Sequence, residues 1–245
     1  MTSLFENTGG MNDILEILQQ MEVNCPIPNS TSNELWKLRR KTKIASHNPS
    51  SEIILEYSVA MLTNNGHLTG WFNQCPTSSG IVSSYSDRRS NVDLVHWDQE
   101  NKVAALYELK WGSNLPHEAI MQILRYGVAY LYCRKHRDKL PVKNRQIMDA
   151  HHITLCVLAP HGYYSKYDML ETTFHIAKQS IERLNIKPVV PDLSMSIEVL
   201  AFPKNFSVLP FKNGEEARKA CDQKKLNSEG EIVQEAFDGL LCLYE

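Results

Sequence analysis

The amino-acid sequence predicts an α/β fold in which helices pack on a small sheet. Three observations favour this class: strand-like segments at residues 92–97 and 103–111 flank a polar turn, an amphipathic helical pattern begins at Pro116, and residues 151–159 form an apolar run typical of a central strand. With 245 residues, of which 42% are hydrophobic, one domain is expected. Its predicted parts are a core of about residues 48–203, a helical N-terminal extension (1–47) and an acidic C-terminal extension (204–245).

The N-terminal extension contains a helical pattern and a basic segment. Apolar residues within positions 12–21 recur at helical spacing and predict a short helix. Residues 36–43 carry five basic side chains and no acid. This segment is a candidate for contacts with nucleic-acid phosphates, and the alternative is the solvated face of a helix.

A helix is expected over residues 50–62. Capping side chains and a proline at residues 48–50 form a start signal, and Asn-Asn-Gly at 64–66 ends the pattern. Glu52 and Glu56 lie one helical turn apart and therefore share a face. An acid in the first turn also suits the helix dipole, so Glu52 has a structural explanation beside any functional one.

A first strand and a polar loop are expected next. Residues 67–75 contain two adjacent aromatic side chains and are expected to form the strand or the approach to it. Residues 76–89 are serine-rich, and Arg88 and Arg89 come just before the hairpin. These arginines are candidates for contacts with a substrate backbone, and the alternative is an ordinary polar surface loop.

The two strand-like segments after this loop form a β-hairpin in this interpretation. If residues 99–102 make the turn, Asp93 lies opposite Glu108. Residues two apart on a strand point to the same face, so Lys110 projects beside Glu108. The hairpin therefore places two carboxylates and one amine on one face.

The facing carboxylates of Asp93 and Glu108 require a reason, because like charges opposite each other destabilise a hairpin and raise each other's pKa. A divalent cation removes the conflict, since carboxylate oxygens are the ligands that hard cations such as Mg²⁺ or Mn²⁺ prefer. A lysine beside them can orient or activate the attacking water and stabilise negative charge on a phosphate. The pattern indicates a site for phosphodiester hydrolysis.

Pro116 begins a second helix with a broad apolar face. Gln122 lies three residues before Arg125 and four before Tyr126, so the three side chains can point toward the carboxylate end of the sheet. A glutamine on a buried helix face indicates a functional role. A tyrosine there is more commonly a core residue with its hydroxyl bonded to a neighbour.

A basic connection follows this helix. Residues 134–145 carry six basic side chains and one acid, and they either contact phosphates or form a solvated connection. The candidates for nucleic-acid contacts in this segment are Arg134, Lys135, Arg137 and Lys139.

The remaining elements complete the sheet and extend the chain. Residues 167–184 predict an amphipathic helix, and residues 195–202 predict a last strand. A closing helix predicted over residues 232–244 suits packing or dimer formation. His151 and His152 face opposite sides of a strand, so they do not form a zinc-ligand pair.

The composition favours a cytoplasmic protein without a membrane partner. The six cysteines are scattered with no Cys-x-x-Cys pair, which indicates reduced thiols. No apolar run is long enough to cross a bilayer, and the N-terminus lacks the pattern of a secretory signal. The net charge of −2 gives no sign of a nucleic-acid partner, so only the local basic segments carry that signal.

Asp93, the hairpin and the sequence Glu108-Leu109-Lys110 resemble the signature of the PD-(D/E)XK nuclease superfamily. Val92 stands where the eponymous motif has proline. The resemblance implies a restriction-endonuclease-like core in the order helix, three-strand meander, helix, strand.

Two further elements belong to this resemblance, which covers roughly residues 49–160. Gln122 and Tyr126 are similar to the Gln-x-x-x-Tyr element of the RecB-like branch. The resemblance also implies one glutamate on the first helix. We favour Glu52, at the beginning of that helix, and Glu56 is the alternative.

The function implied by the resemblance is that of a magnesium-dependent nuclease, with DNA favoured over RNA as the substrate. The resemblance assigns the cation (Mg²⁺ or Mn²⁺) to Asp93, Glu108 and the Leu109 carbonyl, the activation of water to Lys110, and supporting roles to Glu52 and Gln122. Restriction, repair and phage defence all fit this function, and so does a homodimer or a larger complex.

Two other interpretations stay open for the sequence. One is a catalytically inactive nucleic-acid-binding or regulatory protein that keeps the nuclease-like fold. The other is an interaction module in which Glu108 and Lys110 are merely an exposed pair on a strand. Burial of Asp93, Glu108 and Lys110 around one site would argue against the second interpretation.

Overall fold

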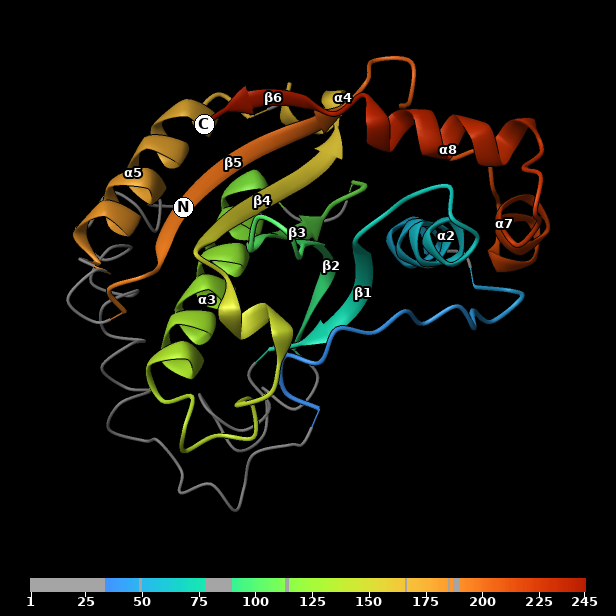
Figure 1. Ribbon diagram of the computed structural model, residues 1–245. Helices are drawn as coiled ribbons and strands as arrows, with labels where there is room; N and C mark the ends of the chain where they lie inside the picture. The colour runs from blue at the N-terminus through green and yellow to red at the C-terminus, as the bar shows by residue number, and fades with distance from the viewer. Residues whose placement is uncertain are drawn as a thin grey trace.

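A computed structural model describes residues 34–48, 50–77, 90–112, 115–165, 167–184, 186 and 190–245. In these residues a six-stranded mixed sheet carries helices on both faces, which confirms the predicted α/β class (Figure 1). The strands are β1 (Trp71–Pro76), β2 (Asn91–Asp98), β3 (Val103–Leu109), β4 (His152–Pro160), β5 (Ser194–Phe202) and β6 (Leu241–Tyr244). The helices are α2 (Ser51–Asn64), α3 (Pro116–Lys135), α4 (His161–Tyr164), α5 (Leu170–Arg183), α7 (Gly214–Cys221) and α8 (Ser228–Asp238), with a 3-10 helix at Gln146–Asp149.

The sheet combines an antiparallel and a parallel part, with its strands in chain order from β1 to β6. β1, β2 and β3 form an antiparallel meander, β4 and β5 continue parallel to β3, and β6 is antiparallel to β5. Helices α3 and α5 supply the crossovers that parallel strands need. β2 and β3 are paired from Asp98 and Val103 to Leu94 and Tyr107, which confirms the predicted hairpin register.

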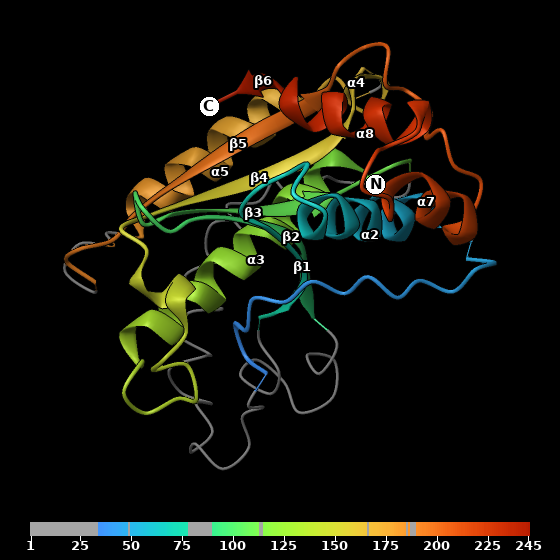
Figure 2. The same cartoon turned by 45° about the vertical axis from the view of Figure 1, so that its right-hand side comes forward.

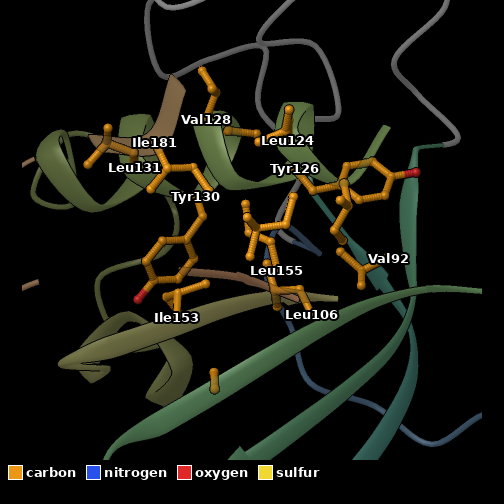
Figure 3. Packing of buried hydrophobic residues seen from close by; sticks show 14 of the residues in the cluster. Val92, Leu106, Leu124, Tyr126, Val128, Tyr130, Leu131, Ile153, Leu155 and Ile181 are labelled. Atoms are coloured by element: carbon orange, nitrogen blue, oxygen red, sulfur yellow. The ribbon is translucent and has the colours of Figure 1, made fainter. Parts of the chain in front are cut away.

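Helices α3 and α5 cover one face of the sheet. Figure 3 shows side chains of these helices, such as Tyr130 and Ile181, above Leu106 of β3 and Leu155 of β4. Gly127 lets α3 approach closely, because a Cβ atom there would lie only 2.6 Å from Leu155 Cδ1. This packing fixes α3 against the two strands that lead to the candidate site.

Helix α2 lies between the other face of the sheet and the C-terminal helices. Figures 1 and 2 show α7 and α8 beside it, and the three helices share an apolar cluster with the sheet. Ile54, Leu55 and Leu62 are each at most 1% exposed. The Asn65 amide at the end of α2 donates a hydrogen bond to the Cys221 carbonyl at 2.7 Å. Because α2 is packed on two sides, the positions of Glu52 and Glu56 relative to the sheet are fixed.

Residues 36–41 form an extended segment along β1. The Asn73 N–H donates to the Arg39 carbonyl at 3.1 Å, and the Asn73 side-chain amide bonds to both backbone groups of Lys41. The edge of a sheet presents unpaired backbone groups, and this segment satisfies those of β1. The predicted helical character of the N-terminal extension is therefore wrong for this segment, and the helix predicted at residues 12–21 lies outside the described residues.

The C-terminal extension ends in a strand, so the helix predicted over residues 232–244 is wrong in its second half. Helix α8 ends at Asp238, and the four residues of β6 then pair with β5. Helical spacing of apolar residues does not reveal that β5 leaves an unpaired edge beside the chain end. That edge, a tertiary feature, selects the strand.

We expect Gly127→Ala to destabilise the protein by about 1–2 kcal/mol, although alanine favours helices, because the added methyl group would overlap Leu155 in a closed core. Denaturant unfolding followed by circular dichroism measures the change. Gly162→Ala is the matched control, since a Cβ atom there meets nothing within 4 Å. Equal losses for the two variants would contradict the close packing of α3.

Candidate active site

The candidate site lies where β2 and β3 separate. Backbone pairing of these strands stops one residue before Asp93 and Glu108, which are the next opposed pair in the same register. At this point a side chain replaces the backbone ladder, because Asp93 Oδ2 accepts a hydrogen bond from the Leu109 N–H at 2.8 Å. The predicted opposition of the two carboxylates is therefore present at the end of the hairpin.

Glu108 and Lys110 form a buried ion pair with an Nζ to Oε1 distance of 2.5 Å. Glu108 is 1% exposed and Lys110 7% exposed, so the interpretation of the two residues as an exposed strand pair is wrong. The second oxygen of Glu108, Oε2, is buried and has no hydrogen-bond partner in the described part of the chain. Such an atom is costly to bury, so one position on Glu108 is open to a ligand.

Both glutamates of α2 reach this region. The carboxylate of Glu56, 2% exposed, accepts a hydrogen bond from Gln74 Nε2. Glu52 Oε1 accepts a hydrogen bond from the Trp111 N–H at 3.0 Å, just beyond β3. The sequence favours Glu52 over Glu56 as the glutamate near the site, whereas the structure brings both residues to this region. We refer to Glu52, Glu56, Asp93 and Glu108 as the acidic cluster.

Burial raises the pKa values of Glu56, Asp93 and Glu108. Loss of hydration raises the pKa of Asp93 to about 7, although the Leu109 N–H and Lys110 act in the opposite direction. Burial, followed by the charge of Asp93, raises the pKa of Glu108 to about 8 against the effect of Lys110. The same two causes hold the pKa of Glu56 well above its ordinary value. Near neutral pH the cluster therefore retains protons that a bound cation would displace.

The donor set fits a hard divalent cation. Asp93 and Glu108 offer carboxylate oxygens, and the Leu109 carbonyl lies on the same side of its strand as the N–H that bonds to Asp93. Mg²⁺ commonly takes one or two carboxylates and leaves its other positions to water and substrate. Across the described ranges, no three His, Cys, Asp or Glu side chains are arranged to hold a metal ion. The fit thus rests on the carboxylates of Asp93 and Glu108, and within Glu108 on the oxygen Oε2, which has no partner in the described residues.

Gln122 and Tyr126 lie on α3 in the neighbourhood of these carboxylates. Gln122 Nε2 donates to the Tyr126 hydroxyl oxygen at 2.8 Å. Burial, and then the charges of Glu108 and Asp93, raise the pKa of Tyr126, so its hydroxyl stays protonated. The structure places the Gln-x-x-x-Tyr pair beside the acidic cluster.

The basic connection after α3 lies at the other end of this helix from the acidic cluster. Figure 1 shows the connection below α3, opposite the arrowheads of β3 and β4. Arg134 and Arg137 form ion pairs with Asp192 and Asp149, each at 2.6 Å. These two arginines therefore have a structural role.

The other predicted nucleic-acid contacts in these regions are not placed at the site. Lys135 ends α3 and Lys139 lies in the turns that follow, and both residues are exposed at the far end of the helix. Arg88 and Arg89 lie outside the described residues.

The basic segment at residues 36–43 is the one that the structure brings toward the acidic cluster. Arg39 Nε donates to the Gln74 carbonyl at 2.7 Å, and Arg40 also bonds to a β1 carbonyl. Burial lowers the pKa of Lys41 and the charge of Arg39 adds to this effect, whereas the carboxylate of Glu56 acts in the opposite direction. The ammonium group of Lys41 is thus within electrostatic reach of the cluster.

Gln74 is a site residue that the sequence does not reveal. It lies opposite Asp93 in the β1–β2 register, and its φ of +53° is rare for a residue other than glycine. In this conformation its amide reaches Glu56, and unusual backbone geometry of this kind is frequent at functional sites. No sequence signal marks the residue, because a polar residue in a strand ordinarily faces solvent.

Comparisons with known proteins do not assign this site. No family model, no curated protein and no solved structure matches the chain. Interpretation of the site therefore depends on its geometry and chemistry.

We expect the metal-free protein to lose stability as the pH rises from about 5 to about 8. The folded-state pKa values of Asp93 and Glu108, about 7 and about 8, exceed the ordinary values of 3.8 and 4.5. The folded protein therefore binds more protons than the unfolded chain over this range, and its free energy of unfolding falls with increasing pH. Thermal unfolding in a chelator at several pH values measures the slope.

The variant Asp93→Asn should flatten this pH dependence and raise Tm at about pH 8, because asparagine does not ionise but still accepts the Leu109 N–H. Each 1 kcal/mol corresponds to about 2–4 °C for a chain of this size. Asp138→Asn, at an exposed position beyond α3, is the control and should keep the wild-type slope. A wild-type Tm that rises with pH would contradict the burial of ionisable carboxyl groups.

Proposed function

We propose that this protein is a metal-dependent nuclease that hydrolyses phosphodiester bonds of DNA. One observation carries the proposal: at the end of a hairpin, Asp93 opposes Glu108, which is paired with Lys110 and has a buried oxygen without a partner in the described residues. Structural ion pairs do not require a second carboxylate beside them, and still less a buried oxygen without a partner. A binding site for a cation and a phosphate accounts for all three groups.

Each residue of the chain has a distinct task in this proposal. Asp93 and Glu108, with the Leu109 carbonyl, hold Mg²⁺ or Mn²⁺ and orient it toward the substrate. When bound, the cation supplies positive charge beside the reacting phosphate. Lys110 orients the attacking water and stabilises the charge that develops on phosphate oxygens. Hydrolysis joins the water oxygen to phosphorus and breaks the bond to one sugar oxygen, which leaves with a proton.

Other residues hold these groups in position. The Glu52 carboxylate fixes the backbone at Trp111, next to Lys110, through a 3.0 Å hydrogen bond. Glu56, held by Gln74, keeps a further acid beside Asp93. We assign Gln122 a supporting role through its hydrogen bond to Tyr126.

The resemblance to the PD-(D/E)XK superfamily supports this assignment. The chain carries a helix (α2), three antiparallel strands (β1 to β3), a helix (α3) and a strand (β4) in the order that the resemblance implies. Within this proposal the protein belongs to that superfamily, with a restriction-endonuclease-like core. Cys75, Cys156, Cys221 and Cys242 are free thiols, the first three of them buried, which suits our assignment to the cytoplasm.

Cleavage of plasmid and linear DNA, with single-stranded DNA and RNA as parallel substrates, tests the function in the presence of Mg²⁺ or Mn²⁺. We expect Asp93→Asn and Glu108→Gln to lower turnover at least about 10³-fold, because each removes a charge that binds the cation. Both variants should remain folded by circular dichroism, and Asp138→Asn should cleave at the wild-type rate. DNA binding without cleavage by the wild type would instead favour the inactive nucleic-acid-binding protein.

The variant Lys110→Met separates catalysis from metal binding. It keeps most of the apolar side chain but removes the amine, which lies 2.5 Å from Glu108 Oε1 and competes with a cation for that oxygen. We therefore expect unchanged or tighter Mn²⁺ affinity by calorimetry, together with turnover about 10²–10³-fold lower at saturating metal. Full turnover with weakened Mn²⁺ binding would exclude the proposed role of Lys110.

A further inference from the structure

Tyr163 carries another of the buried polar atoms that lack a hydrogen-bond partner in the described residues. It lies on α4, the short helix that directly follows β4. Its hydroxyl oxygen is inaccessible to solvent and makes no hydrogen bond within the described residues. Buried hydroxyl groups are nearly always hydrogen-bonded, because leaving one unpaired costs free energy. In this protein the comparable hydroxyl of Tyr130 donates to the Ile147 carbonyl at 2.7 Å.

The packing around Tyr163 holds its ring in place. The ring lies edge-on to that of Tyr164, with centroids 5.2 Å apart and planes at 80°. Tyr164 is itself fixed, since its hydroxyl lies 3.1 Å from the Val157 carbonyl of β4 and 2.8 Å from the Leu200 carbonyl of β5. Tyr163 also packs against the apolar cluster beneath α3, which includes Tyr126. The hydroxyl is therefore held in position within the protein.

The position of α4 relates Tyr163 to the candidate active site. β4 runs parallel to β3, with Val157 opposite Glu108 and Leu158 opposite Leu109. The two strands therefore end on the same side of the sheet, so that α4 begins beside the end of β3. Tyr163 is on α4, so the sheet topology places it at the same end of the sheet as the acidic cluster.

The charged groups that face Tyr163 are carboxylates. Burial raises its pKa, and the charges of Glu118, Glu52 and Glu108 raise it further, so the hydroxyl remains a protonated donor. Each carboxylate is engaged elsewhere: Glu118 with the Leu115 N–H, Glu52 with the Trp111 N–H and Glu108 with Lys110. The site thus combines an unused donor, Tyr163 Oη, with an unused acceptor, Glu108 Oε2.

We propose that Tyr163 contacts the substrate and donates a hydrogen bond to a non-bridging oxygen of the scissile phosphate. The inference rests on the proposed nuclease function and adds a catalytic residue that lies outside the PD-(D/E)XK and Gln-x-x-x-Tyr patterns. The carboxylates around Tyr163 bond to other groups, so a phosphate oxygen is the acceptor that its hydroxyl lacks. The hydrogen bond strengthens as negative charge grows on that oxygen, so it stabilises the transition state more than the bound substrate.

The variant Tyr163→Phe removes only the hydroxyl group. Contact of this hydroxyl with the substrate and a packing role alone predict different turnover for this variant. If the hydroxyl serves the substrate, its removal from a buried unpaired position should raise Tm by about 1–2 °C. Turnover of DNA at saturating Mg²⁺ should fall about 10–100-fold with KM changed less than about twofold. If Tyr163 is only a packing residue, Tm should rise by the same amount, because the hydroxyl is unpartnered in the free protein in either case, but turnover should not change.

Tyr130→Phe is the matched control, because it deletes a buried hydroxyl that is satisfied at the far end of α3. It should lower Tm and leave turnover unchanged. If the wild type cleaves DNA and Tyr163→Phe cleaves it at the same rate, the role of Tyr163 is overturned and the nuclease function still stands. No cleavage by the wild type, on any substrate with Mg²⁺ or Mn²⁺, would overturn the proposed function and this inference with it.

Discussion

Negative charge is buried where β2 separates from β3, and the surrounding elements supply the groups that make this burial possible. The Asp93 carboxylate accepts the Leu109 N–H in place of a backbone partner, and Lys110 neutralises part of the charge on Glu108. Even so, burial raises the pKa values of Asp93 and Glu108 to about 7 and about 8. The site in its metal-free form is therefore electrostatically unsatisfied, which is the property that a cation-binding site requires.

The rest of the fold holds these groups in place despite their mutual repulsion. Helix α2 is packed between the sheet and helices α7 and α8, so Glu56 remains among the carboxylates although it is 2% exposed. On the other face, Gly127 brings α3 close to β4 and thereby sets Gln122 and Tyr126 near the site. The two apolar clusters stabilise the fold, and part of this stabilisation offsets the unfavourable free energy of placing the acidic cluster in the protein.

The distribution of charge is more informative than its total. The chain has a net charge of −2, yet two of its basic segments have different surroundings. Arg134 and Arg137 are engaged in ion pairs beyond the end of α3, whereas the segment of Lys41 runs along β1 beside Gln74 and Glu56. In the proposed nuclease, DNA would reach the carboxylates past this second segment, where positive charge lies next to the site.

The sequence by itself determined the α/β class, the hairpin register, and the opposition of Asp93 and Glu108 beside Lys110. These features are local: alternation along a strand and the length of a turn decide which side chains share a face. The extended segment along β1 and the last strand, β6, were decided by unpaired edges of the sheet, which no local pattern contains.

The supporting residues of the site also depended on the tertiary structure. Gln74 reaches Glu56 through a left-handed backbone conformation, and Tyr163 lies at the same end of the sheet as the site because β4 ends beside β3. The difference has a physical reason. Periodicity and turn chemistry act between residues close in the chain, whereas a shared site is built from segments that meet only after the sheet and its helices have packed.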